Sequence, residues 1–272
     1  MVLLYPTPLM YGFSCFIIAG RILGIGILNH DAGHLTLFKT KKLNPIVGRW
    51  LLGGFVLVDY DAFREGHLRH HQYAGTVEDP DAIFVQNYPA TPVSMLRKFG
   101  RDISGINGFK EIIYQLKVST WFKRVPTIAI HTLVIASLIP FEGVWVYSAY
   151  WVAFIFIYPL FIRIRIMGEH GGVTKNVSHD PRENTATTYA SAMERLFVAP
   201  NHVNFHLEHH IHQNIPAQNL KKAHKLFKQR GLYEGFHCIA PNYWQVIKRC
   251  INAKTGKSNS KQHASSSANN LS

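Results

Sequence analysis

The chain has 272 residues, of which 47% are hydrophobic and 17% are charged, and its formal net charge is +13. The apolar residues form long runs with almost no charge, which is typical of membrane spans rather than of a soluble core. Nucleic-acid binding would explain the positive charge, but the sequence has no zinc-finger or RNP-type motif. Cys15, Cys238 and Cys250 fit neither a zinc knuckle nor a small disulfide framework.

The first apolar run covers residues 8–28, which is long enough to cross roughly 30 Å of hydrocarbon. Arg21 is its single charged residue and is expected to pair inward or to extend to the interface. No positive region precedes the run, so it is predicted to remain in the membrane rather than to be cleaved as a signal peptide.

Residues 46–60 are apolar but short, and Gly53 and Gly54 interrupt them, which predicts a membrane-surface or re-entrant helix. Residues 61–73 are polar and rich in histidine, and residues 78–123 have the mixed composition of a soluble segment. Two further apolar runs, residues 125–140 and 143–162, are separated by a turn and predict a membrane hairpin.

The expected fold is all-α: an integral membrane helical bundle with a cytoplasmic helical cap that carries a histidine-rich two-metal site. Residues 1–252 are expected to form one membrane domain. Residues 253–272 are rich in Ser, Asn and Lys and are predicted to be a disordered polar tail. One span followed by a hairpin leaves all histidine motifs on the face with most of the Lys and Arg, which should be cytoplasmic.

The 16 histidines are strongly clustered. The clusters are His30-Asp-Ala-Gly-His34, His67-Leu-Arg-His70-His71 and His206-Leu-Glu-His209-His210. Imidazoles spaced i, i+3 and i+4 share one face of a helix and can bind metal there. Random placement predicts roughly 0.05 HxxHH motifs in the chain, whereas two are present. Surface histidines on amphipathic helices would explain one such motif, but not all three.

Eight imidazoles are too many for one zinc ion, which usually takes four ligands. Imidazole also suits iron, copper and nickel, so the ligand type alone does not identify the metal. The HExxH motif of zinc hydrolases is absent, and the deaminase-like HxE at residues 206–208 has no PCxxC after it. A redox-active pair of metal ions therefore explains the clusters better than zinc.

The motifs HDAGH, HLRHH and NFHLEHH resemble the three histidine boxes of the membrane fatty acid desaturase/hydroxylase superfamily. EHGG at residues 169–172 and NTATT at residues 184–188 are also similar to its acyl-lipid desaturases, and the resemblance covers residues 27–232. It implies two iron ions that use O2 as co-substrate, with no catalytic or cofactor-binding residue beyond the metal ligands. The implied ligands are His30, His34, His67, His70, His71, His170, His206, His209 and His210. His202, one helical turn before His206, remains open as a competitor.

The resemblance further implies a lipid acyl substrate in the bilayer, desaturated in a narrow apolar tunnel lined by residues 13–28, 51–58 and 152–161. No haem motif is present, so electrons are expected from a separate ferredoxin or cytochrome b5 that docks on Lys39, Lys41 and Lys42. Members of the family usually have two spans before the first box, where this chain shows one. Partners that orient the imidazoles are sought among Asp31, Glu65, Glu169, Asn204 and Glu208.

Other activities remain open from sequence. A hydroxylase or a carotenoid ketolase of the same superfamily would use the same boxes. A histidine-rich metal transporter would place ionisable residues along its spans, but here only Arg21 and His131 lie within spans, and His131 is expected to pack or hydrogen bond. The histidines not expected to bind metal are His179, His212, His224, His237 and His263.

Overall fold

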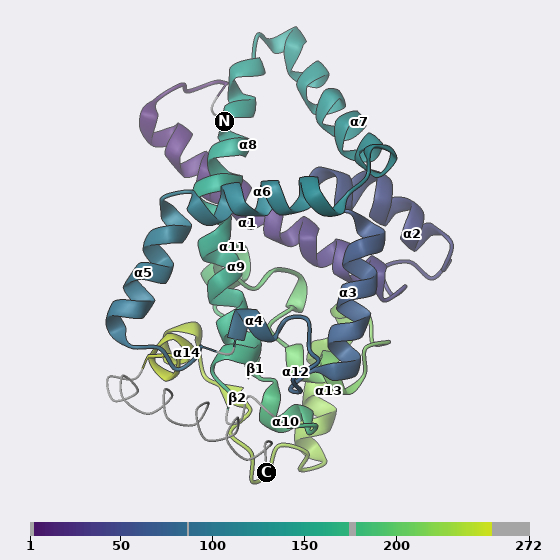
Figure 1. The fold of residues 1–272 in the computed structure, drawn as a ribbon, viewed down its shortest axis with the longest axis vertical. Helices are drawn as coiled ribbons and strands as arrows, with labels where there is room; N and C mark the ends of the chain where they lie inside the picture. The colour runs from purple at the N-terminus through teal and green to yellow at the C-terminus, as the bar shows by residue number, and fades with distance from the viewer. Residues whose placement is uncertain (1–2, 86, 174–177, 252–272) are drawn as a thin grey trace, which may run out of the picture.

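The computed structural model describes residues 3–85, 87–173 and 178–251. Regular structure in these residues is almost entirely helical, as predicted, apart from a short parallel pair of strands, β1 (Thr187–Thr188) and β2 (Ile239–Ala240). In Figure 1 the hairpin that contains α7 and α8 projects at one end of the molecule, whereas α10, α12 and α13 gather at the other end. The predicted tail, residues 253–272, lies outside the described residues.

Three helical segments are long and apolar enough to cross a membrane, in agreement with the three predicted spans. They are α1 (Pro8–Gly33), the segment Trp121–Phe141 and the segment Val144–Gly171. Two of them continue beyond their predicted ends, to Gly33 and to Gly171, and these extra turns carry His30 and His170. The second segment consists of α7 (Trp121–Leu138) and η2 (Ile139–Phe141), and the third of η3 (Val144–Tyr147), α8 (Ser148–Val152), η4 (Ala153–Ile157), α9 (Tyr158–Ile166) and η5 (Met167–Gly171).

Helix α1 begins where the sequence provides a cap. Thr7 Oγ1 accepts the backbone N–H of Met10 at 3.3 Å, and Pro8 occupies the start of the helix, where its missing N–H would have no partner anyway. At the other end the N–H of His34 donates to the His30 carbonyl at 3.1 Å. Both histidines of the first box therefore lie at the same end of the first span.

The segment between α1 and the hairpin is a series of shorter helices. The apolar residues 46–60 cover the end of α2 and the π-helical η1, neither of which is long enough to cross a membrane. Asp59 Oδ1 accepts the N–H groups of Asp61 and Ala62 and so caps the helix that carries the second box. The helices are α2 (Leu43–Val47), η1 (Gly48–Gly53), α3 (Tyr60–Tyr73), α4 (Ala82–Val85), α5 (Pro92–Ile103) and α6 (Ile106–Val118).

After the hairpin the chain forms short helices that pack beside α1 and α3. The third box occupies α12, and the basic segment around residue 225 forms an amphipathic helix, α13. These helices are α10 (Pro181–Asn184), α11 (Ala192–Phe197), η6 (Pro200–His202), α12 (His206–Ile211), α13 (Ala217–Gln229) and α14 (Tyr243–Arg249).

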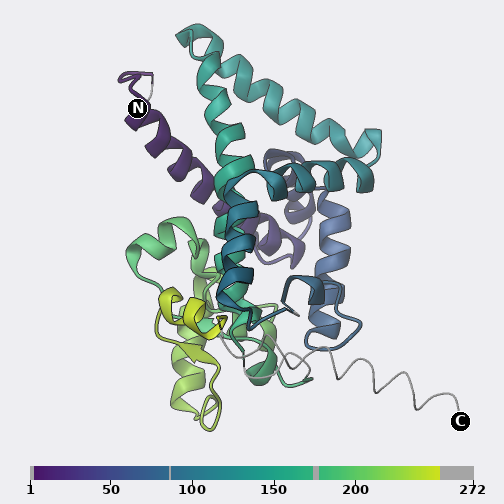
Figure 2. The same ribbon diagram turned by 60° about the vertical axis from the view of Figure 1, so that its left-hand side comes forward.

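Helix α1 connects the spans to the histidine-bearing helices. It crosses the Val144–Gly171 segment in both views (Figure 1, Figure 2), and one apolar core joins Ile22 and Ile27 to Phe154 and Phe161. On another side α11 approaches so closely that a Cβ at Gly20 would lie 2.5 Å from the Leu196 carbonyl oxygen. Arg21, the single charge of the first predicted span, donates to that same carbonyl.

Candidate metal centre

The nine predicted ligands converge in two groups at the ends of α1 and of the Val144–Gly171 segment. Within each group one potential ligand atom per residue lies within 4.8 Å of all the others. The five-histidine group consists of His30, His34, His67, His71 and His209. The four-histidine group consists of His70, His170, His206 and His210.

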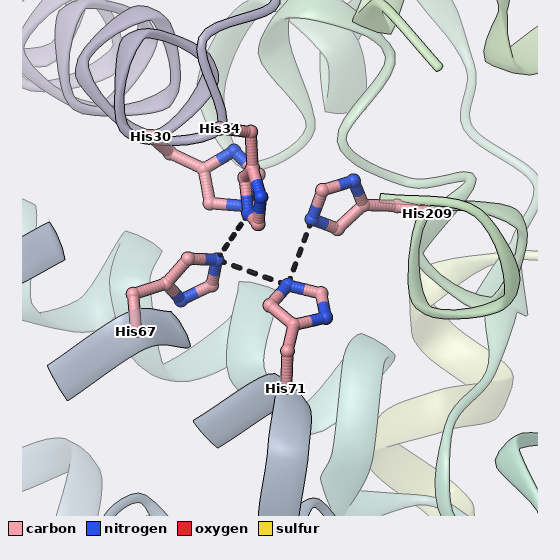
Figure 3. Close-up of side chains that lie close together, drawn as sticks. All are labelled: His30, His34, His67, His71 and His209. Carbon is pink, nitrogen blue, oxygen red and sulfur yellow. Dashed lines mark hydrogen bonds between the residues drawn. The ribbon is translucent and has the colours of Figure 1, made fainter. Parts of the chain in front are cut away.

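In the five-histidine group the rings face one another from α1, α3 and α12 (Figure 3). The Nε2 atoms of His34 and His67 are 2.9 Å apart, those of His67 and His71 are 3.1 Å apart, and those of His71 and His209 are 3.0 Å apart. The ring of His30 lies 4.4 Å from that of His67 and 4.5 Å from that of His209, centroid to centroid.

The four-histidine group repeats this geometry beside the first. His206 Nε2 is 3.0 Å from His170 Nε2 and 3.1 Å from His210 Nε2. The His70 ring lies 4.9 Å from the His170 ring. The groups adjoin each other, because the rings of His71 and His210 stack at 4.2 Å. The arrangement is suited to two neighbouring ions.

Each HxxHH motif supplies both groups. His67 and His71, four residues apart on α3, enter the five-histidine group, whereas His70 enters the four-histidine group. On α12 the i, i+4 pair enters the four-histidine group and His209 enters the other. On a helix, residues i+3 and i+4 lie to opposite sides of residue i. The structure thus refines the expectation of one shared face: the face is shared, but its rings divide between two sites.

The environment keeps most of the rings neutral. Burial, followed by neighbouring histidines, holds the pKa values of His67, His206, His209 and His210 well below the ordinary value. Burial, followed by the charge of Arg64, lowers the pKa of His34 to about 4. Neutral imidazole is the form that binds metal.

The donor set fits metal ions. Nitrogen ligands lie about 2.0–2.1 Å from an ion such as zinc, so two at right angles are about 3 Å apart, which matches the observed Nε2 separations. His30 Nε2 is buried and has no hydrogen-bond partner among the described residues. Such an orphaned nitrogen is costly unless it binds something. Nitrogen-only groups of five and four imidazoles agree with a transition-metal pair.

Three rings have an Nδ1 hydrogen-bond partner that fixes their orientation. His30 Nδ1 lies 3.1 Å from Asp31 Oδ1, one of the candidate partners. His206 Nδ1 lies 3.6 Å from Glu169 Oε1, which is too far for a hydrogen bond, and has no other partner among the described residues. Arg165 Nε donates to the same Glu169 oxygen at 2.7 Å. Partners of this kind set the ring tautomer and strengthen metal binding.

The other two partners were missed from the sequence. His70 Nδ1 lies 2.8 Å from Asp79 Oδ1, and His170 Nδ1 lies 3.1 Å from the Asn184 carbonyl oxygen. Asp79 was predicted only to make a turn; it does so by accepting the Asp81 N–H at 2.8 Å, and it also contacts the histidine. A hint was available for Asn184, because it begins the NTATT motif.

Glu208 was one of the candidate partners of the ligands, but its contacts lie outside both groups. It is fully buried and accepts from Thr187 and from Tyr233, and its Oε1 lies 2.7 Å from His224 Nδ1. His224, predicted not to be a ligand, lies in neither group and instead links α13 to α12.

The remaining candidates lie elsewhere. Glu65 is exposed, and Asn204 donates to the Thr188 carbonyl at 2.9 Å rather than to a histidine. His202 joins neither group. His131 packs in the hairpin, as predicted, with Nδ1 2.7 Å from the Tyr147 hydroxyl. His179, His212 and His237 are exposed, whereas His263 lies outside the described residues.

Comparison with known proteins adds independent evidence. Residues 6–241 match the model of the fatty acid desaturase family. The sn-1 oleoyl-lipid 12-desaturase of Picosynechococcus is 24% identical over 245 residues, 80% of this chain and 70% of that protein. The Delta(12) fatty acid desaturase of Mortierella alpina is 39% identical over 62 residues, 23% of this chain and 15% of that protein. The chloroplastic sn-2 acyl-lipid omega-3 desaturase (ferredoxin) of Arabidopsis thaliana is 41% identical over 56 residues, 21% of this chain and 12% of that protein.

Proposed function

Because this chain belongs to the fatty acid desaturase family, we propose that it is an O2-dependent membrane enzyme that introduces a double bond into a lipid acyl chain at two non-haem irons. The observation that carries the proposal is the convergence of nine histidines from separate segments into two adjoining groups. The relatives that match are named as acyl-lipid and fatty acid desaturases, which supports this reaction.

In the proposed reaction two vicinal C–H bonds of the acyl chain break and a double bond forms. The substrate supplies two electrons and two protons, an external donor supplies two electrons, the solvent supplies two protons, and O2 is reduced to two waters. The irons, when bound, supply the oxidising power. The nine histidines would hold the irons, and Asp31, Asp79 and the Asn184 carbonyl hold three of the rings in place.

The acyl chain is proposed to enter from the bilayer through the apolar core. The three predicted lining segments do meet there: Ile22, Leu23, Val56 and Phe154 belong to one buried cluster. We propose that residues 1–252 act as one catalytic domain in the membrane. The histidine groups would face the cytoplasm, because Lys and Arg dominate the loops on that side.

Electrons are proposed to come from an acidic carrier of the ferredoxin or cytochrome b5 type. Lys39, Lys41 and Lys42 follow the first box and are all exposed in the connection between α1 and α2. The Arabidopsis relative carries ferredoxin in its name, which supports the first type. Neutralising the three lysines should reduce donor-dependent turnover several-fold at low salt. Unchanged turnover and salt dependence would place the docking surface elsewhere.

The test of the proposed function combines metal content with product analysis. The purified protein should contain about two irons per chain, as expected for a two-metal site, and cells that express it should gain an unsaturated acyl species. A His70→Ala/His209→Ala variant, which removes one histidine from each group, should lose the unsaturated species and at least the iron of the four-histidine group. His237→Ala, at an exposed histidine outside the groups, is the matched control. Absence of iron, or the same lipids with and without the ligand histidines, would refute the proposal.

A hydroxylase or ketolase reaction at the same irons is the second candidate, because the same histidine groups serve these activities in the superfamily. The product decides between them: desaturation removes two hydrogens, whereas hydroxylation adds one oxygen. An oxygenated product with iron still bound would keep the metal site and change the reaction.

A further inference from the structure

A cavity separate from both histidine groups lies between α11, η6 and α13. Its volume is about 630 Å³, which is within the range of small-molecule binding sites. The cationic residues that line it are Arg195, Lys221, Lys225 and Lys228, and His202 and His224 lie beside them. We call this hollow the basic cavity.

The positive charge of the basic cavity is not neutralised by the protein. No carboxylate lines it, and none of its four Lys and Arg side chains forms an ion pair within the described part of the chain. Glu194, beside Arg195 in sequence, is already occupied by the N–H groups of Ser191 and Tyr243. Burial, followed by the charges of Lys221 and Arg195, lowers the pKa of His202. Uncompensated cations lining a concave surface attract an anion.

The walls of the cavity are held in place. Lys221, Lys225 and Lys228 share one face of α13, while Leu220 and Ala223 bury the other. Asn201 and His202 both have positive φ angles, 54° and 62°, which are uncommon for residues other than glycine. Asn201 Nδ2 donates to the Gly24 carbonyl at 2.8 Å and so fastens this turn to α1.

One buried polar atom on the cavity wall has no partner. Asn204 is 4% exposed, and its Oδ1 has no hydrogen-bond partner among the described residues, while its Nδ2 donates to Thr188. A buried acceptor of this kind is costly unless a donor reaches it. A ligand that carries both an anionic group and a hydroxyl would satisfy the cations and Asn204 together.

The position of the cavity points to a lipid. Helix α11 packs on Gly20 and Arg21 of α1, and η6 on Gly24, roughly 14–20 Å along the helix from its histidine end. The Phe197 ring of α11 also lies 5.6 Å from Phe161 of the third span, and Met193 of α11 is 65% exposed. Two walls of the basic cavity, α11 and η6, therefore adjoin helices that are long and apolar enough to cross a membrane.

We propose that the basic cavity binds the phosphate and hydroxyl groups of an anionic glycerolipid headgroup, so that the acyl chain which the enzyme oxidises is carried by such a lipid. The identity of the carrier rests on the proposed function; the binding does not. The wall of the cavity is directly connected to the metal centre. Tyr189 OH lies 3.0 Å from His224 Nε2, whose Nδ1 contacts Glu208 on α12, and Asn204 and Phe205 immediately precede His206.

Binding is tested on the purified full-length protein in detergent with soluble short-chain lipids. Phosphatidylglycerol should bind more tightly than phosphatidylcholine, which is zwitterionic, and than a galactolipid, which has no phosphate. Lys221→Ala/Lys225→Ala should weaken phosphatidylglycerol binding roughly 30-fold, the expectation for two lysines at an anionic lipid surface. Lys222→Ala/Arg230→Ala removes equal charge from the same exposed segment but outside the cavity and should bind as the unaltered protein does.

Arg195→Gln, on α11 rather than α13, provides a second variant, and circular dichroism and thermal unfolding show whether each variant is folded. Equal binding of all three lipids, or equal losses in the cavity and control variants, would overturn the proposal. Inorganic phosphate that binds as well as phosphatidylglycerol would assign the cavity to a soluble phosphate ester instead. If the cavity variants lost binding to an acidic electron carrier but bound lipids unchanged, the basic cavity would be a docking site for the carrier instead.

The headgroup distribution of the products separates this inference from the proposed function. New double bonds should be enriched in anionic phospholipids, and the enrichment should disappear in Lys221→Ala/Lys225→Ala but not in its control. Desaturation spread evenly over all headgroups would refute the inference and leave the function intact. If the protein bound the headgroup but oxidised no lipid, the headgroup site would stand and the proposed function would be refuted.

Discussion

The two histidine groups adjoin each other but are supported differently. In the four-histidine group two rings have an Nδ1 hydrogen-bond partner: Asp79 for His70 and the Asn184 carbonyl for His170. In the five-histidine group the described residues show such a partner for His30 alone, namely Asp31. One group therefore depends on oriented ligands and the other on their number, which predicts different responses to the same kind of mutation.

The largest difference is expected when one ligand is removed from each group. His206→Ala leaves only three histidines in the four-histidine group, and this group should therefore lose its iron. Iron per chain should fall from about two to about one, the loss of one ion from a two-metal site. His34→Ala leaves four imidazoles, the usual number around a bound metal, and should retain nearly all of its iron. Metal analysis of both purified variants measures this, and equal iron loss would remove the distinction.

A smaller effect is expected from Asp79→Asn. Loss of the carboxylate weakens the orientation and basicity of His70, and partners of this kind typically contribute 10–100-fold to metal affinity, so a loss of roughly that size is expected. Asp81→Asn is the matched control, because its carboxylate lies 3.8 Å from His70 Nδ1 and its side chain is 48% exposed. Competition with a chelator measures both affinities. If Asp81→Asn lost as much metal affinity as Asp79→Asn, total negative charge rather than the hydrogen bond would support His70.

These partners also show where sequence reasoning stops. Helical spacing identified eight of the nine converging histidines, because i, i+3 and i+4 relationships are local, whereas His170 was identified only from the resemblance of its EHGG motif. The allocation of each ring to a group was not predictable, since it depends on how α3 and α12 face each other in space. Asp79 lies nine residues from His70, and Asn184 lies fourteen from His170. Only tertiary packing brings such pairs into contact.

The fold follows the same division. Hydropathy located the three spans, because an apolar run of sufficient length has few other stable environments. It placed two of their ends too early, at residues 28 and 162, because the last turns are polar. Those turns remain helical where α1 and the third span pack beside η6 and β1. A hydropathy pattern therefore predicts where a helix crosses a membrane, but not how far it continues beyond it.

The two groups should also differ in their response to pH. In the metal-free protein burial lowers the pKa of His70, but the hydrogen bond to Asp79 and the charge of Asp81 outweigh burial and raise it overall. A metal that enters the four-histidine group must therefore displace a proton from His70. Its affinity should fall as the pH drops below that raised pKa, by up to about tenfold per pH unit for one proton.

The pKa of His34 is lowered to about 4, and those of His67 and His209 lie well below the ordinary value, so these rings are neutral between about pH 5 and pH 7. The affinity of the five-histidine group should be constant over that interval. Cobalt(II) titrations of the metal-free protein at several pH values would resolve the two affinities. Parallel slopes for both groups would contradict the assignment of His70 as the one protonated ligand.

The smallest effect is expected from Asp31→Asn. Asp31 Oδ1 lies 3.1 Å from His30 Nδ1, compared with 2.8 Å for Asp79 and His70, so its hydrogen bond is the longer and weaker of the two. The same group contains four other histidines. Metal affinity should therefore fall only a few-fold, below the roughly 10–100-fold range of an essential partner. Chelator competition on Asp31→Asn beside Asp79→Asn tests this directly. If the two variants lost equal metal affinity, the fifth histidine would not compensate for the loss of an orienting partner.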